Sequence, residues 1–135
     1  MDLKDFSAST EDMVVDLSAR YESLKNADGS HMTMTFYAPH SKEAKKIKHD
    51  LTDQKIAQIR ETSGEIDKGI TLSSAEIEEL AFEEMVCMLK TWNITWDNKK
   101  PKATESKARE VLGKLPWVDL LYQEARAKSL NFIQT

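Results

Sequence analysis

The stretch that decides the fold opens with Leu72-Ser73-Ser74-Ala75-Glu76-Ile77 and carries an apolar pattern on towards Trp92. Ser73 and Glu76 have the spacing of a capping box: the Ser73 hydroxyl accepts a hydrogen bond from the Glu76 amide, and the Glu76 carboxylate accepts one from the Ser73 amide. The acids of this first turn lie where the helix dipole favours negative charge. Apolar residues then recur at helical spacing, namely Ile77, Leu80, Ala81, Met85, Met88, Leu89 and Trp92. We therefore expect this stretch to be the central helix of the fold.

Two apolar runs before this helix predict an antiparallel β-hairpin over residues 12–38. The first run is Met13–Leu17, and the second, residues 32–37, alternates its side chains with the period of a strand. Asp28-Gly29 between them suits a turn that needs a positive φ at its second residue. Gly29-Ser30-His31-Met32 also matches an expression-tag remnant, but the preceding strand and the turn favour native sequence. A lone hairpin is marginally stable in water, so it must pack on helices or on the sheet of another copy.

Three further helices are expected. One runs from about Lys42 to Thr62 behind the N-cap Ser41, and its thin apolar stripe indicates that it covers a core rather than forming its centre. Another runs from about Glu105 to Lys114, and Thr104 caps it. The last helix starts at Pro116, because proline is tolerated at the first helical position. Its expected core-facing residues are Trp117, Leu120, Leu121, Ala125 and Phe132.

The expected fold class is mainly α, of the α+β kind, with an N-terminal β-hairpin followed by about four helices. Residues 1–11 are expected to be a loose N-terminus, and residues 12–135 a single domain whose helical part is 41–132. The 135 residues suffice for one modest core, and 40% apolar with 31% charged residues is ordinary for a globular domain.

Composition and motif spacing offer little support for a catalytic, cofactor-binding or metal-binding function. Cys87 is the only cysteine, so no internal disulfide can form, and a reducing compartment is the simple interpretation. The three histidines lack metal-ligand spacing, and no glycine-rich loop follows a strand. We therefore expect no enzyme activity, no cofactor and no metal site. No apolar run approaches the roughly 20 residues that span a bilayer, and the start lacks a signal-peptide pattern, which predicts residence in the cytoplasm of the cell that makes the protein.

Charge is distributed in blocks along the chain. Residues 42–60 carry six bases and three acids, whereas residues 61–84 carry eight acids and one base. Such blocks attract within a fold or between copies of the chain, and solvated helix faces are the favoured alternative.

The nucleic-acid candidate is a basic face, defined here as Lys42, Lys45, Lys46 and Lys48. Lysines at helical spacing can meet phosphates. No arginine or aromatic residue interleaves to read bases, and the net charge of −4 gives no reason to expect non-specific binding to DNA or membranes. A solvated face is therefore favoured over a nucleic-acid site.

Three short stretches, in an order that spans about residues 12 to 132, resemble a known family. In the first, Asp28-Gly29 and the strand to Tyr37 lead through Pro39-His40-Ser41 into a Ser-capped helix. In the second, residues 85–96, a helix ends in a Trp before a variable loop. The third runs from Leu115-Pro116-Trp117 to Asn131-Phe132 and looks like a closing helix. Together they resemble the tail assembly chaperones of long-tailed bacteriophages.

The resemblance implies a function. Such chaperones bind the long, largely helical tape measure protein in the cytoplasm of the infected host cell. They keep its apolar surface soluble until tail tube subunits polymerise around it, and they are absent from the mature virion. Many of these genes also make a longer product by a frameshift, whose extension recruits the tail tube protein, and this chain corresponds to the short form. Repeated copies on one long partner predict a homo-oligomer.

Candidate contact residues follow from the apolar pattern, since large apolar groups on short helices suit a protein that works by contact. The first choice is Trp117, Leu121 and Phe132. Met32, Met34 and Phe36 come next, because Met on a strand face is a feature of adaptable binding surfaces. The alternative, that these residues form the core, is at least as well supported for the tryptophans.

Overall fold

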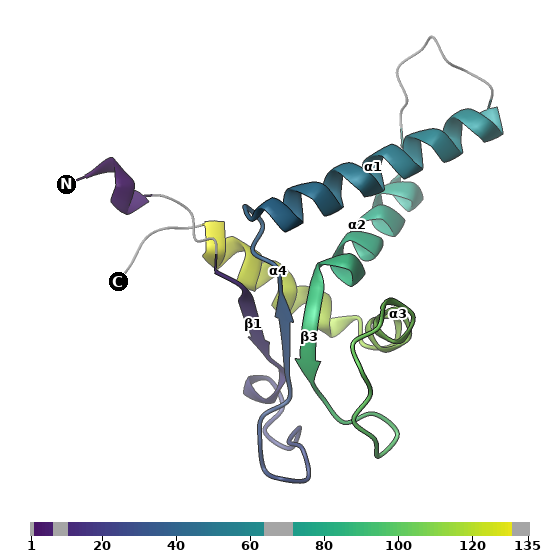
Figure 1. Cartoon of the computed structure of the whole chain (residues 1–135). Helices are drawn as coiled ribbons and strands as arrows, with labels where there is room; N and C mark the ends of the chain where they lie inside the picture. Colours follow the sequence, from purple (N-terminus) through teal and green to yellow (C-terminus); the bar gives the residue numbers. More distant parts are fainter. Residues whose placement is uncertain (1, 7–10, 64–71, 131–135) are drawn as a thin grey trace.

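The fold is built around a short central strand, β2 (Thr33–Phe36). The computed structural model describes residues 2–6, 11–63 and 72–130. β1 (Met13–Asp16) pairs antiparallel with one edge of β2, and β3 (Leu89–Asn93) pairs antiparallel with the other. The sheet order is therefore β1-β2-β3 (Figure 1). The predicted hairpin is confirmed, whereas the third strand was not predicted.

The central helix is shorter than the sequence predicted. α2 (Ser74–Met88) ends at Met88, and Leu89 already has extended backbone and opens β3. The prediction of a helix reaching Trp92 was wrong because Leu89 and Trp92 also fit a strand opposite Phe36 and Met34, across a β-bulge. Apolar spacing over so few residues does not distinguish helix from strand, and pairing with the free edge of β2 decides the outcome.

The helix starts agree closely with the sequence. Both hydrogen bonds of the Ser73–Glu76 capping box form, at 3.2 and 3.1 Å. Ser41 accepts from the Ala44 amide at the start of α1 (Lys42–Ser63), and Thr104 accepts from the Lys107 amide at the start of α3 (Glu105–Lys114). α4 (Trp117–Leu130) follows Pro116. Two 3₁₀ helices complete the described elements, η2 (Leu17–Ala19) and η1 (Leu3–Phe6), the latter within the segment predicted to be loose.

The sheet has one apolar face and one open face. Side chains of β1, β2 and β3 on the apolar face form the centre of the core, with Met34 and Phe36 fully buried. α4 packs along this sheet, and the Phe36 and Tyr122 rings lie 4.7 Å apart. On the opposite face Val14 is 62% exposed. Figure 1 shows α1 and α2 side by side, extending together beyond one end of the sheet.

The inward face of α4 differs from the predicted stripe. Val118 and Tyr122 are the buried residues, whereas Leu120 is 56% exposed. Leu121 is half-buried against the core, as are Trp117 and Ala125. The inward arc is therefore centred on the Val118–Tyr122 line, which adjoins the predicted one, because the Tyr122 ring fills the space beside Phe36. In α2, Ile77 is likewise exposed rather than inward.

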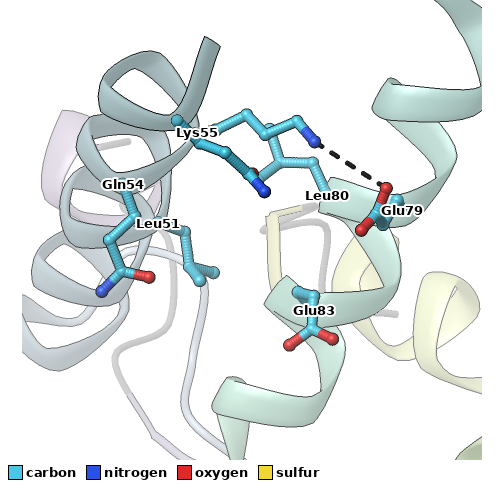
Figure 2. Close-up of a pocket in the computed structure, with 7 residues that line it drawn as sticks. Leu51, Gln54, Lys55, Glu79, Leu80 and Glu83 are labelled. Atoms are coloured by element: carbon cyan, nitrogen blue, oxygen red, sulfur yellow. Dashed lines mark ion pairs between the residues drawn. The ribbon is translucent and has the colours of Figure 1, made fainter. Parts of the chain in front are cut away.

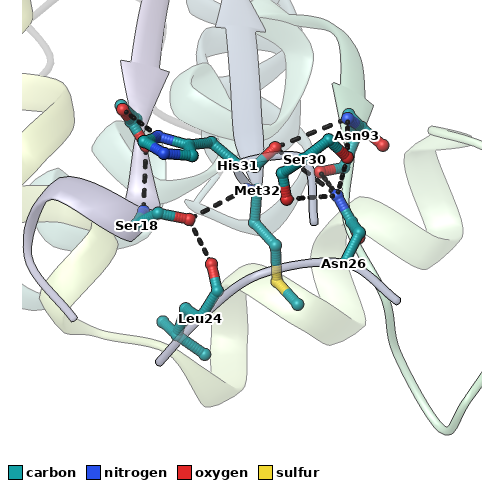
Figure 3. Close-up of polar contacts among 8 residues, drawn as sticks. Ser18, Leu24, Asn26, Ser30, His31, Met32 and Asn93 are labelled. Atoms are coloured by element: carbon teal, nitrogen blue, oxygen red, sulfur yellow. Dashed lines mark hydrogen bonds and ion pairs between the residues drawn. The ribbon is translucent and has the colours of Figure 1, made fainter. Parts of the chain in front are cut away.

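A polar cluster closes the long connection between β1 and β2 (Figure 3). The Ser18 hydroxyl donates to the Leu24 carbonyl and accepts from the Met32 amide. Buried Asn26 donates through its side-chain amide to Ser30 and accepts from the Thr95 hydroxyl at 2.7 Å. Gly29 has the expected positive φ, of 84°. The cluster ties the hairpin connection to the segment that follows β3.

Two tryptophans anchor the loop between β3 and α3. The Trp92 indole donates to the Pro101 carbonyl at 2.8 Å, and the Trp96 indole donates to the Glu110 carboxylate at 3.0 Å. The loop reverses through Asp97 and Asn98, both with positive φ. These contacts fix α3 relative to the sheet.

The burial of Phe36 gives a direct test of this core. We expect Phe36→Ala to lower the free energy of unfolding by about 3–5 kcal/mol, because it leaves a cavity at the centre of the sheet. Val14→Ala, on the open face of the neighbouring strand, should cost less than about 1 kcal/mol. Urea unfolding followed by circular dichroism measures both. Equal effects of the two substitutions would contradict the assignment of the two faces.

Candidate partner-binding groove

Three helices enclose an open apolar groove of about 580 Å³. Its walls are α2, the end of α3 and the start of α4. The residues that line it are Glu78, Ala81, Phe82, Met85, Leu112, Gly113, Pro116 and Asp119. Met85 and Leu112 are buried and belong to the core, so the floor of the groove is continuous with the interior. The volume lies within the roughly 300–1,000 Å³ of ligand-binding clefts.

Gly113 keeps the groove open on the α3 side. A Cβ atom added there would lie 3.9 Å from Cζ of Phe82, an ordinary van der Waals contact. A larger side chain at this position would therefore extend over Phe82 into the groove without a backbone clash. Sequence analysis did not identify Gly113 as a site residue, because its role depends on Phe82 in another helix.

An ion-pair cluster fixes the distance between the walls α2 and α3. The Arg109 guanidinium donates to both carboxylate oxygens of Glu83, at 2.9 and 2.6 Å, and to Glu105 at 3.0 Å. This hydrogen bonding lowers the pKa of Glu83 and raises the pKa of Arg109. Bidentate pairs of this kind impose geometry as well as attraction, so the cluster orients α3 against α2.

A second hollow, of about 320 Å³, lies between α1 and α2 and is more polar (Figure 2). Lys55 of α1 reaches across it to Glu79 and Glu76, at 3.7 and 3.9 Å. One base of the 42–60 block thus pairs with acids of the 61–84 block within the fold. Because charged side chains pair across this hollow, it is less suited than the groove to an apolar partner.

A cavity of about 130 Å³ brings together three of the predicted contact residues, Met32, Met34 and Trp117. Its lining is mostly apolar and also includes Leu17, Leu24, Ile94, Thr95, Trp96 and Leu115. The Tyr21 ring packs edge-on against Trp117, with centroids 5.1 Å apart. Leu17, Met34 and Ile94 are buried in the core, and the partly buried lining residues Met32, Trp96, Leu115 and Trp117 pack against it. We therefore assign this cavity to the core rather than to a docking surface.

Phe36 and Leu121, the described residues among the remaining predicted contacts, do not line the groove. Phe36 is buried beside Tyr122, and, like Met34, it presents no surface to a partner in this structure. Leu121 is half-buried against the core. Phe132 lies outside the described residues. The placement of Met34, Phe36 and Leu121 favours the core alternative. The new candidate contacts are residues that line the groove, namely Phe82, Gly113 and Pro116.

In the part of the chain that the structure describes, other chemical groups form no competing site. Among the described residues, no three His, Cys, Asp or Glu side chains gather as metal ligands. Burial raises the pKa of the half-buried Cys87 thiol, which disfavours the reactive thiolate. None of the described helices has the length and apolar character needed to cross a membrane. Comparison with family models, curated proteins and solved structures finds no match to this chain.

The Arg109–Glu83 pair predicts a pH dependence of stability. The folded-state pKa of Glu83 lies below the ordinary value of 4.5, so its contribution is present above that pH and is lost as the pH falls through the folded-state pKa. We expect Glu83→Gln to reduce the stability lost between about pH 6 and pH 3, measured by urea unfolding.

Arg109→Gln is the matched variant, because it removes the guanidinium that lowers the pKa of Glu83. It should reduce the acid sensitivity in the same direction as Glu83→Gln. Acid sensitivity equal to that of the unmodified chain in both variants would contradict the role of the pair.

Proposed function

We propose that this chain is a tail assembly chaperone of a long-tailed bacteriophage and that its groove binds helical segments of the tape measure protein. The observation that carries the proposal is the open apolar groove between α2, α3 and α4. Such grooves receive the apolar side of an amphipathic helix, whose contacts recur at i, i+3 and i+4. A largely helical partner offers many such segments.

The resemblance supports the same proposal in two of its three stretches. The strand to Phe36 leads into a helix capped by Ser41, and a closing helix follows Pro116. The stretch from Met85 to Trp96 departs from the expected pattern, because α2 ends at Met88 and β3 replaces its last turn. The proposal therefore rests on the groove and on the first and third of these stretches.

Reversible binding is compatible with a groove that is open and mainly apolar. Chaperone release during tube polymerisation requires contacts that are individually weak, and repeated copies along one partner raise the overall affinity. Within this proposal the chain acts as a homo-oligomer in the host cytoplasm and is absent from the mature virion. A longer frameshift product would recruit the tail tube protein.

The gene itself provides the first test. We expect a slippery heptamer near the 3′ end of the reading frame, an overlapping frame beyond it and then a very long gene for a helical protein. Neighbouring genes unrelated to tails would contradict the proposal. The long gene also supplies the partner needed for the binding experiment.

The binding experiment compares Gly113→Leu with Ala127→Leu on co-expression with that tape measure protein. Gly113→Leu fills the groove beside Phe82 and should lower recovery of the soluble complex at least about tenfold, equivalent to about 1.4 kcal/mol. It should leave the fold intact, since replacing a helical glycine gains up to about 1 kcal/mol.

Ala127→Leu adds the same side chain at an exposed position of α4 that does not line the groove, so it should leave recovery unchanged. Equal recovery with both variants would place the binding site elsewhere. Failure of the unmodified chain to keep the tape measure protein soluble would contradict the proposed function itself.

The basic face of α1 supports a second candidate function, that of a small nucleic-acid-associated protein. Lys42, Lys45 and Lys46 are exposed, and no ion pair with an acid is found for them among the described residues. We expect weak, salt-sensitive retention on DNA at most. Strong retention that is lost when these lysines become Glu would favour this function over the chaperone.

A further inference from the structure

The acids of α2 differ in how they are paired. Glu76 and Glu79 lie near Lys55, Glu83 binds Arg109, and Glu84 lies 3.8 Å from Arg126. Glu78 has no cationic partner among the described residues, and it lines the groove. The unpaired acid of this helix is thus the one at the edge of the apolar site.

The opposite wall of the groove repeats this arrangement. Asp119, in the first turn of α4, is exposed and lines the groove. Its carboxylate accepts a hydrogen bond from the Gln123 side-chain amide at 3.4 Å. No ion pair to Asp119 is found in the part of the chain that the structure describes. Carboxylates without an ion-pair partner among the described residues therefore lie on the α2 wall and on the α4 wall. Between them lies the apolar surface of Phe82, Met85 and Leu112.

We infer that the groove recognises an amphipathic helix with an apolar ridge and flanking Lys or Arg side chains. The inference rests on the proposed function and names the chemistry of the tape measure segments that bind. The apolar ridge contacts Phe82 and the buried floor, while the flanking cations meet Glu78 and Asp119. Opposite charges across an interface chiefly set specificity and association rate, which suits a partner that must later leave.

A second copy of this chain is the other candidate occupant, because the basic face of α1 carries the required charge. Its apolar stripe, however, is already used within the fold. Ala44 is fully buried, and Ile47 packs against the core. The basic face therefore lacks an exposed apolar ridge beside its lysines, which favours a separate protein as the occupant.

Three synthetic helical peptides test the inference. They share one Leu ridge and carry Lys, Gln or Glu at the flanking positions. Fluorescence anisotropy with the full chain should give binding about tenfold tighter for the Lys peptide than for the Glu peptide, since each exposed pair changes affinity severalfold at most. The difference should shrink at about 0.5 M salt, where exposed charges are screened.

Charge-neutral variants assign the preference to the groove. Glu78→Gln with Asp119→Asn should abolish the preference for the Lys peptide and retain binding of the Gln peptide. Glu124→Gln, an exposed acid of α4 that does not line the groove, should keep the preference. Gly113→Leu should weaken binding of all three peptides.

The outcomes separate the inference from the proposed function. Equal binding of the Lys and Glu peptides, or a preference that survives the double neutralisation, would overturn the inference, even if the tape measure protein is kept soluble. A concentration-dependent dimer that Gly113→Leu abolishes would overturn it in favour of a second copy. A preference for the Lys peptide without any binding of the tape measure protein would support the inferred recognition of flanking cations and contradict the chaperone function.

Discussion

The burial of Met34 and Phe36 is the constraint on which the rest of the structure depends. Both side chains leave the central strand β2 on its apolar face, and both are inaccessible to solvent. A hairpin alone cannot cover them, because two strands offer too little apolar surface to be stable in water. The third strand and α4 supply the cover: β3 brings Leu89 opposite Phe36, and α4 places the Tyr122 ring beside it.

This constraint also positions the groove. The Tyr37 amide donates to the Met88 carbonyl at 3.0 Å, so the end of α2 is attached directly to the end of β2. No loop separates α2 from β3, which places Met85 at the boundary between core and groove. Arg109 then holds α3 against α2 through Glu83. The groove is therefore a consequence of how the helices must attach to a small sheet.

Local features were predictable from the sequence, and features that depend on distant contacts were not. The caps at Ser41, Ser73 and Thr104 involve residues three apart, and the hairpin follows from alternation around Asp28-Gly29, so each was found. β3 was missed because its strand conformation depends on the free edge of β2, more than fifty residues earlier. The groove was missed for the same reason, since Phe82 and Gly113 become neighbours only in the folded chain. The apolar pattern identified Met34 and Phe36 as candidate contact residues, and the structure places both in the core.

Amide ¹H–¹⁵N spectra of the labelled chain, recorded with and without the tape measure protein, test the central claim most directly. The account predicts that the largest changes fall on the walls of the groove, at residues 78–85 and 112–119. Residues 42–48 of α1 and the strands of the sheet should change little. Changes confined to the basic face or to the open face of the sheet, with the groove unaffected, would contradict the account.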